Sequence, residues 1–188
     1  MKKLLLIITL FSASHSFSQE KSKEKIKKVF WGYKIGIAST GANSISTDIT
    51  KQTNAFGYCA GIFADIRIGG RENFFFRPTI QLVKYGSNVE FKNPKINPNI
   101  AIRELGICFP LGFLYKVDDE FEFGVGGSST LWFDSNLTSG VQTTNGLNLV
   151  IGYVVDEKTS LQLNYSFETK SDVNYKRNAL GFSVLRYF

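Results

Sequence analysis

The chain has 188 residues, a formal net charge of +6 and 14% aromatic residues, which fits a single domain. Much of the positive charge is local, because residues 20–28 hold five Lys and two Glu, so we expect no nucleic-acid partner. The single histidine, His15, lies in a leader that we expect to be removed. Histidine-based catalysis and metal binding are therefore excluded for the mature chain.

Residues 1–18 predict a secretory signal peptide. Two lysines precede an apolar run at residues 4–11, and small residues stand before a cleavage site near Ser18. The run is too short to cross a bilayer, which takes about 20 residues in a helix. We expect residues 19–29 to form a charged, flexible tail in the periplasm.

Residues 30–188 form a series of segments in which apolar side chains recur at every second position, the period of a β-strand. In one of them Phe56, Tyr58 and Ile62 share a face, whereas Gly57 and Gly61 share the other. The eight segments cover residues 31–38, 56–68, 74–82, 104–116, 121–133, 146–153, 161–168 and 180–188.

Three properties of these segments indicate that the apolar face points outward. The polar face is rich in glycine, which weakens a strand in water but suits the crowded interior of a narrow barrel. The apolar face is too bulky for a small closed interior, since it carries many of the 17 Phe. Apolar stretches of about 9–11 residues also match tilted strands that cross a hydrocarbon layer.

The connections between segments alternate in expected length. Short connections fall at residues 69–73, 118–119 and 156–158, and longer polar ones at 40–54, 86–99, 134–142 and 169–177. Short periplasmic turns that alternate with longer outer loops are typical of outer-membrane barrels. The sequence therefore predicts an all-β fold, an eight-stranded antiparallel up-and-down transmembrane β-barrel in the outer membrane.

The segment ELGICFPLGFLYKV, with Glu104, Pro110 and Lys116, the segment FEFGVGG and the terminal GFSVLRYF resemble the PorT-like outer-membrane barrels of the Bacteroidetes type. The resemblance covers about residues 30–188. It implies a structural or accessory role in the outer membrane, and protein secretion is one role that it suggests. Partners would be outer-membrane lipid and components of a secretion apparatus.

The resemblance also implies insertion by the barrel-assembly machinery, which reads an aromatic C-terminal strand. Phe182, Val184 and Phe188 would form this C-terminal insertion signal. Arg186 departs from the aromatic residue that often stands two positions before the end, so the match to the signal is partial.

Charged residues of the polar faces predict a cluster in the lumen. A buried charge is tolerated when it is paired and hydrogen-bonded, so we expect a structural plug of ion pairs, with a gated or substrate-binding lumen as the alternative. Six residues would lie near the periplasmic end and two towards the outer end: Lys34, Asp65, Arg67, Arg77, Lys116 and Glu122, and Glu104 and Glu168.

Cys59 and Cys108 fall on inward faces with one strand between them. Two strand spacings separate them by about 10 Å, whereas a disulfide needs Cα atoms within about 7 Å. We therefore expect two free thiols.

Three functions compete at this stage. The first is a non-enzymatic structural or accessory barrel, and the second is a surface binder or adhesin that works through loops such as 40–54 and 86–99. The third is a lipid-modifying enzyme, which the missing histidine disfavours. We expect no catalytic site, no cofactor and no metal.

Overall fold

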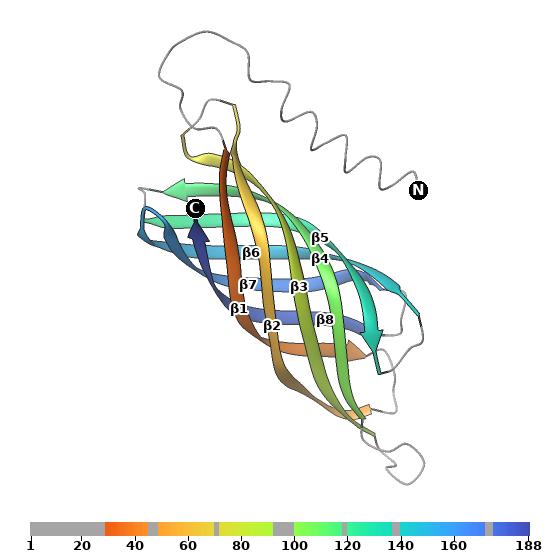
Figure 1. Cartoon of the computed structure of the whole chain (residues 1–188). Helices are drawn as coiled ribbons and strands as arrows, with labels where there is room; N and C mark the ends of the chain where they lie inside the picture. The colour runs from red at the N-terminus through yellow and green to blue at the C-terminus, as the bar shows by residue number, and fades with distance from the viewer. Residues whose placement is uncertain are drawn as a thin grey trace.

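The computed structural model describes residues 29–44, 49–69, 72–91, 100–117, 120–136, 140–171 and 175–188. The expected signal peptide and nearly all of the expected tail lie outside these residues. Eight strands form one closed barrel, each antiparallel to its neighbours, and β1 pairs with β8 (Figure 1). The strands are β1 (Val29–Ser44), β2 (Ile49–Arg67), β3 (Phe74–Phe91), β4 (Ile100–Val117), β5 (Phe121–Ser135), β6 (Gln142–Asp156), β7 (Thr159–Ser171) and β8 (Tyr175–Tyr187).

The expected fold class is confirmed. Figure 1 shows the strands running obliquely around the barrel. We call the end where β1 begins and β8 finishes the turn end, and the opposite end the loop end. Within the described segments, no helix is long and apolar enough to cross a membrane.

The outer surface of the barrel is apolar, as the alternation predicts. On β1, Ile35 and Ile37 are 58% and 53% exposed, whereas Gly32 and Gly36 on the inner face are buried. On β5, Val125 is 56% exposed. An apolar surface that continues around the whole sheet is far larger than a soluble monomer exposes, and hydrocarbon is the solvent that it fits.

The strands are longer than the alternation predicts, and the predicted loop lengths are wrong. β2 has 19 residues, and most of the expected loop 40–54 belongs to β1 and β2. About 9–11 residues suffice to cross the hydrocarbon layer, so the surplus extends the barrel beyond it at the loop end. In these extensions the outer face meets water and carries polar residues such as Asn88, Glu90 and Arg103, whereas inward residues such as Ser87 and Val89 stay buried. The apolar alternation is therefore lost although the backbone pairing continues.

The other long loops are also shorter than expected, because the strands on either side extend into them. The gaps between strands leave 92–99 between β3 and β4, 136–141 between β5 and β6, and 172–174 between β7 and β8. Register shifts between Asn54 and Tyr58 and between Leu105 and Gly106 lie towards the loop end, and one between Val154 and Asp156 lies at the turn end. Such irregularities are common at barrel rims, where they re-aim the strand.

The interior is filled mainly by side chains, including large apolar ones, of which the alternation placed only Leu185 on the inner face. Phe63, Phe75, Trp132 and Leu185 are all buried. Glycines make room for them: a Cβ at Gly32 would lie 2.8 Å from Cε1 of Phe63. Filling by side chains is the expected state of an eight-stranded barrel.

The last strand closes the barrel against the first. Phe182 and Val184 pair with Ile37 and Ile35, and the backbone N–H of Phe188 donates to the carbonyl of Trp31 at 3.0 Å. Side chains of the expected insertion signal all face outward and are exposed: Phe182, Val184 and Phe188. Closure leaves no unpaired edge strand, which is the condition for a sheet to cross a membrane.

Candidate functional site: two ion-pair networks in the lumen

The first network lies inside the turn end of the barrel and is centred on Arg77 of β3. Its guanidinium binds Asp65 of β2 in a bidentate arrangement, Nε to Oδ1 at 2.5 Å and Nη2 to Oδ2 at 2.7 Å. The hydroxyl of Tyr187 on β8 donates to Asp65 Oδ2 at 2.7 Å and lies 2.9 Å from Arg77 Nη2. Bidentate pairs of this kind are among the strongest polar contacts in proteins.

Glu122 of β5 extends this turn-end network across the lumen. Its Oε2 lies 3.6 Å from Arg77 Nη2, and its Oε1 accepts hydrogen bonds from Ser160 at 3.3 Å and from Gln162. Ser160 and Gln162 belong to β7, on the opposite side of the barrel from β3. The turn-end network therefore spans the lumen from wall to wall.

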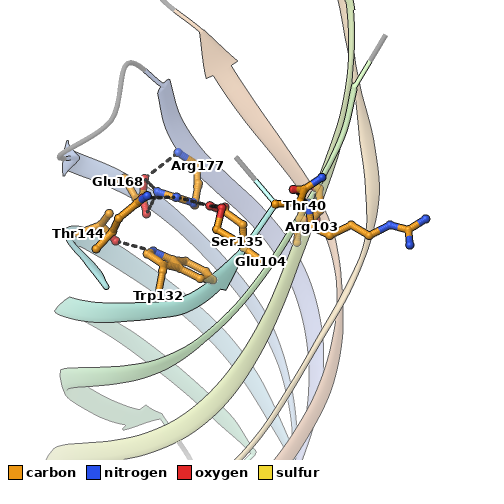
Figure 2. Close-up of polar contacts among 11 residues, drawn as sticks. Thr40, Arg103, Glu104, Trp132, Ser135, Thr144, Glu168 and Arg177 are labelled. Carbon is orange, nitrogen blue, oxygen red and sulfur yellow. Dashed lines mark hydrogen bonds and ion pairs between the residues drawn. The ribbon is translucent and has the colours of Figure 1, made fainter. Parts of the chain in front are cut away.

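The second network lies at the loop end and is centred on Arg177 of β8 (Figure 2). Arg177 Nε and Nη2 bind the two carboxylate oxygens of Glu104 on β4 at 2.5 and 2.7 Å. Its Nη1 lies 3.1 and 3.0 Å from the carboxylate oxygens of Glu168 on β7. Because β4 and β8 face each other across the barrel, this loop-end network also spans the lumen.

Aromatic rings and hydroxyls complete the surroundings of Arg177. Its guanidinium lies 4.7 Å from the ring centroid of Trp132, and the indole N–H of Trp132 donates to Thr144 at 3.0 Å (Figure 2). Ser135 donates to Glu104 at 3.1 Å. A buried guanidinium with two carboxylates and a ring face has the partners that its burial requires.

Arg177 is the residue of the site that the sequence interpretation missed. It fell within the expected loop 169–177, whereas it is a buried residue of β8. The sequence contained two signals for it. Arg177 has the inward phase of Gly181 and Ser183, and the two inward carboxylates at the outer end, Glu104 and Glu168, had no expected cation.

The remaining predicted lumen cations have no carboxylate partner among the described residues. The guanidinium of Arg67 lies 5.9 and 5.8 Å from the ring centroids of Phe30 and Phe75, which pack against each other. Lys116 lies 5.1 and 5.3 Å from the ring centroids of Phe75 and Tyr187. Ring faces therefore take the place of carboxylates near the turn end.

Lys34 lies between the two networks rather than within either. Its ammonium donates to Asn164 Oδ1 at 3.0 Å. Along the inward face of β7, Asn164 follows Gln162 of the turn-end network and precedes Glu168 of the loop-end network. The prediction grouped Lys34 with the periplasmic-end charges, and the structure places it nearer the middle of the lumen.

A cavity of about 190 Å³ occupies the lumen around Lys34. Its lining is more apolar than polar and includes Phe63 and Leu114 together with Cys59, Cys108 and Asn148. Both cysteines are free, as expected. In the described residues no three histidine, cysteine or carboxylate side chains gather to hold a metal ion. The cavity has the size to hold several water molecules, at about 30 Å³ each, beside polar side chains such as Asn148.

The two lumen thiols provide a test of how well the networks close the barrel. We expect Cys59 and Cys108 to resist a maleimide reagent in the folded barrel and to react fully after unfolding in denaturant, with labelling followed by mass spectrometry. The reagent must pass one of the networks to reach them. Complete labelling of the folded barrel within minutes would contradict closure at both ends.

No protein family and no curated protein sequence matches this chain significantly. Among solved structures it is similar to Neisserial surface protein A, with a TM-score of 0.53, 17% identity, and coverage of 84% of this chain and 97% of the other. It is also similar to Ail, the attachment invasion locus protein of Yersinia pestis, solved with the heparin analogue sucrose octasulfate. Here the TM-score is 0.52, the identity 10%, and the coverage 86% and 99%. Together with the closed sheet and the apolar outer surface, these likenesses give the chain the fold of a small outer-membrane β-barrel.

Proposed function

We propose that the protein is a non-enzymatic, integral outer-membrane β-barrel with a structural or accessory role. The observation that carries this proposal is the pair of ion-pair networks, centred on Arg77 and Arg177, that span the lumen at both ends. A barrel built to conduct solutes would leave an open path along the lumen, and a diffusion pore requires more than eight strands. The working surfaces would then be the loop end, the rim and the N-terminal tail.

A permeability measurement tests this proposal. In liposomes, the reconstituted protein is expected to leave the uptake of small sugars and ions at the level of protein-free liposomes, because both networks must break to open a path. A large porin reconstituted in parallel supplies the positive control. Steady conductance by the wild-type protein would contradict a closed structural barrel and favour a gated lumen.

The location and the partners complete the proposal. The apolar outer surface of the barrel, which we call the apolar belt, supports contact with outer-membrane lipid. The outward Phe182, Val184 and Phe188 offer the barrel-assembly machinery an exposed C-terminal strand. The proposed periplasmic tail, residues 19–29, would lie at the turn end, where β1 begins.

A part in protein secretion is the more specific form of the proposal and rests on the PorT-like resemblance alone. If it holds, deletion of the gene changes the set of exported and surface proteins, and crosslinking in intact membranes captures secretion components. An unchanged set of exported proteins, from a strain in which only this gene is removed, would exclude the secretion role while leaving the closed barrel intact.

A surface binder remains the second candidate, supported by exposed cations at the loop end. Lys51, Lys170 and Lys176 are exposed there on three different strands. The solved Ail complex contains a heparin analogue. If this chain binds sulfated polysaccharide, replacing the three lysines with glutamine is expected to weaken binding to immobilised heparin at low salt, with the heat-induced gel shift of the folded barrel unchanged.

A further inference from the structure

We propose that Lys84 of β3 and Arg103 of β4 form a binding site for the phosphate of a lipid headgroup on the outer wall of the barrel. The inference rests on the insertion of the barrel in a membrane and is independent of the secretion and binder roles. The site lies outside the lumen, on the opposite side of the sheet from the loop-end network.

The position of the two cations along their strands places them where the apolar belt ends. On the outer face of β3, Ile80 and Leu82 are 41% and 40% exposed, and the next outward residue is the exposed Lys84. On β4, the exposed Arg103 shares the outer face with Leu105 and Ile107 and lies on their loop-end side. Headgroup phosphates lie at this boundary between hydrocarbon and water, where cationic side chains reach them.

The strand register brings the two cations together. Lys84 faces Leu105 and Gly86 faces Arg103, so Lys84 and Arg103 are diagonal neighbours on one face of the β3–β4 pair. Diagonal neighbours lie about 7–8 Å apart, which long side chains can bridge around one phosphate group. Arginine suits this role because its planar guanidinium binds phosphate through two parallel hydrogen bonds.

The backbone around Arg103 is held in place by one residue, Asn136. The backbone N–H of Arg103 donates to the side-chain Oδ1 of Asn136 at 2.8 Å, and its carbonyl accepts from the backbone N–H of Asn136 at 3.3 Å. The side-chain Nδ2 of Asn136 donates to the carbonyl of Ala101 at 2.6 Å. Figure 2 shows the Arg103 side chain directed away from the residues of the loop-end network. The guanidinium is therefore presented outward from a fixed backbone.

The surroundings of the site supply a platform and one opposing charge. The Lys84 ammonium lies 5.4 Å from the ring centroid of Tyr58, which faces Lys84 across β2 and β3. In the described residues neither Lys84 nor Arg103 forms an ion pair. Asp134 of β5 faces Leu105, one diagonal step from Arg103, and so offsets part of the positive charge.

The experiment measures lipid retention by native mass spectrometry of the folded barrel from mixed micelles that contain lipid A or its dephosphorylated derivative. The wild-type barrel is expected to retain lipid A in preference to the dephosphorylated derivative. A K84Q/R103Q variant is expected to bind it about 20- to 30-fold more weakly, since each cation near a lipid surface contributes a factor of about five. K158Q/R186Q removes two exposed cations at the turn end, away from the site, and is the matched control.

Removal of the nearby negative charge gives a second test in the opposite direction. Asp134→Asn leaves both cations in place and removes the nearby negative charge, so it is expected to strengthen retention of the phosphorylated lipid a few-fold. The heat-induced gel shift verifies that each variant is folded, so a failure of the site is distinguishable from a failure of the barrel. Equal retention by the wild-type and K84Q/R103Q proteins would overturn the proposal. So would displacement of the lipid by inorganic phosphate or heparin at equal concentration, because the site would then take soluble anions.

Discussion

Replacing Arg177 with methionine is expected to lower the free energy of unfolding by about 3–5 kcal/mol, the cost of leaving a buried charge without its partner. Arg177 satisfies Glu104 and Glu168 together, and all three side chains are at least nine-tenths buried. The variant leaves two carboxylates facing each other in the lumen. Urea unfolding of the barrel reconstituted in lipid vesicles, followed by tryptophan fluorescence, measures the change.

Arg186→Met is the matched control for this prediction, because Arg186 lies on the same strand but is exposed on the outer face. Its replacement is expected to change the free energy of unfolding by less than about 1 kcal/mol. Replacing Glu104, Glu168 and Arg177 together with Gln, Gln and Met should recover much of the loss, since no uncompensated charge then remains. An Arg177→Met barrel as stable as the wild type would contradict the prediction, because it would show that water solvates Glu104 and Glu168 as well as the ion pairs stabilise them.

Replacing Gly126 with valine is expected to prevent the barrel from closing, or to cost about 3 kcal/mol or more if it closes. Gly126 of β5 faces the lumen opposite Gly112. A Cβ at this position would collide with the carbonyl oxygen of Leu111 and would lie 2.6 Å from the Cα of Gly112. Both are backbone atoms, so no side chain can move aside to relieve the contact. The fraction of protein that acquires the heat-sensitive gel mobility measures closure.

The adjacent residue offers the control. Gly127 has the opposite phase on β5, and a Cβ there would meet only the carbonyl oxygen of Gly146 at 3.8 Å. Gly127→Val adds a β-branched side chain to the lipid-facing surface, which suits a strand, so the yield of folded barrel should be unchanged or higher. If both variants fold equally well, the lumen is less tightly packed at Gly126 than the structure indicates.

The outer wall could be predicted from the sequence because one rule governs it. Lipid contacts every second residue, so residues such as Ile35, Val125 and Phe182 repeat with a period of two along each strand. The closed eight-stranded sheet follows from that repeat and from the number of segments. Placement of Asp65, Arg77 and Glu122 on the inner wall follows from the same period, since their outward neighbours are apolar.

The lumen partners could be predicted only in part, because they are joined across the barrel and not along the chain. Arg177 and Glu104 are separated by 73 residues, and Tyr187 and Asp65 by 122. No local sequence pattern indicates pairings between residues so far apart along the chain. The inward Phe63 and Trp132 were missed for a related reason: on the inner wall apolar and polar side chains mix, so no periodic signal marks them. The strand extensions beyond the membrane lack the signal altogether, since their outer face meets water and carries polar residues such as Asn88 and Glu90, and their buried inner face mixes polar and apolar residues.

The contribution of β8 to both networks has a consequence for the order of assembly. Arg177 and Tyr187 stand near its two ends, and between them they reach β2, β3, β4 and β7. Until β8 arrives, Glu104 and Glu168 have no guanidinium and Asp65 lacks its hydroxyl donor, so a seven-stranded sheet would carry uncompensated charge towards a lipid phase. Pairing of β8 thus settles the lumen as well as the sheet edge: a sheet without β8 would hold two unpaired carboxylates at the loop end and would lack one hydrogen bond at the turn end, where Arg77 still pairs with Asp65.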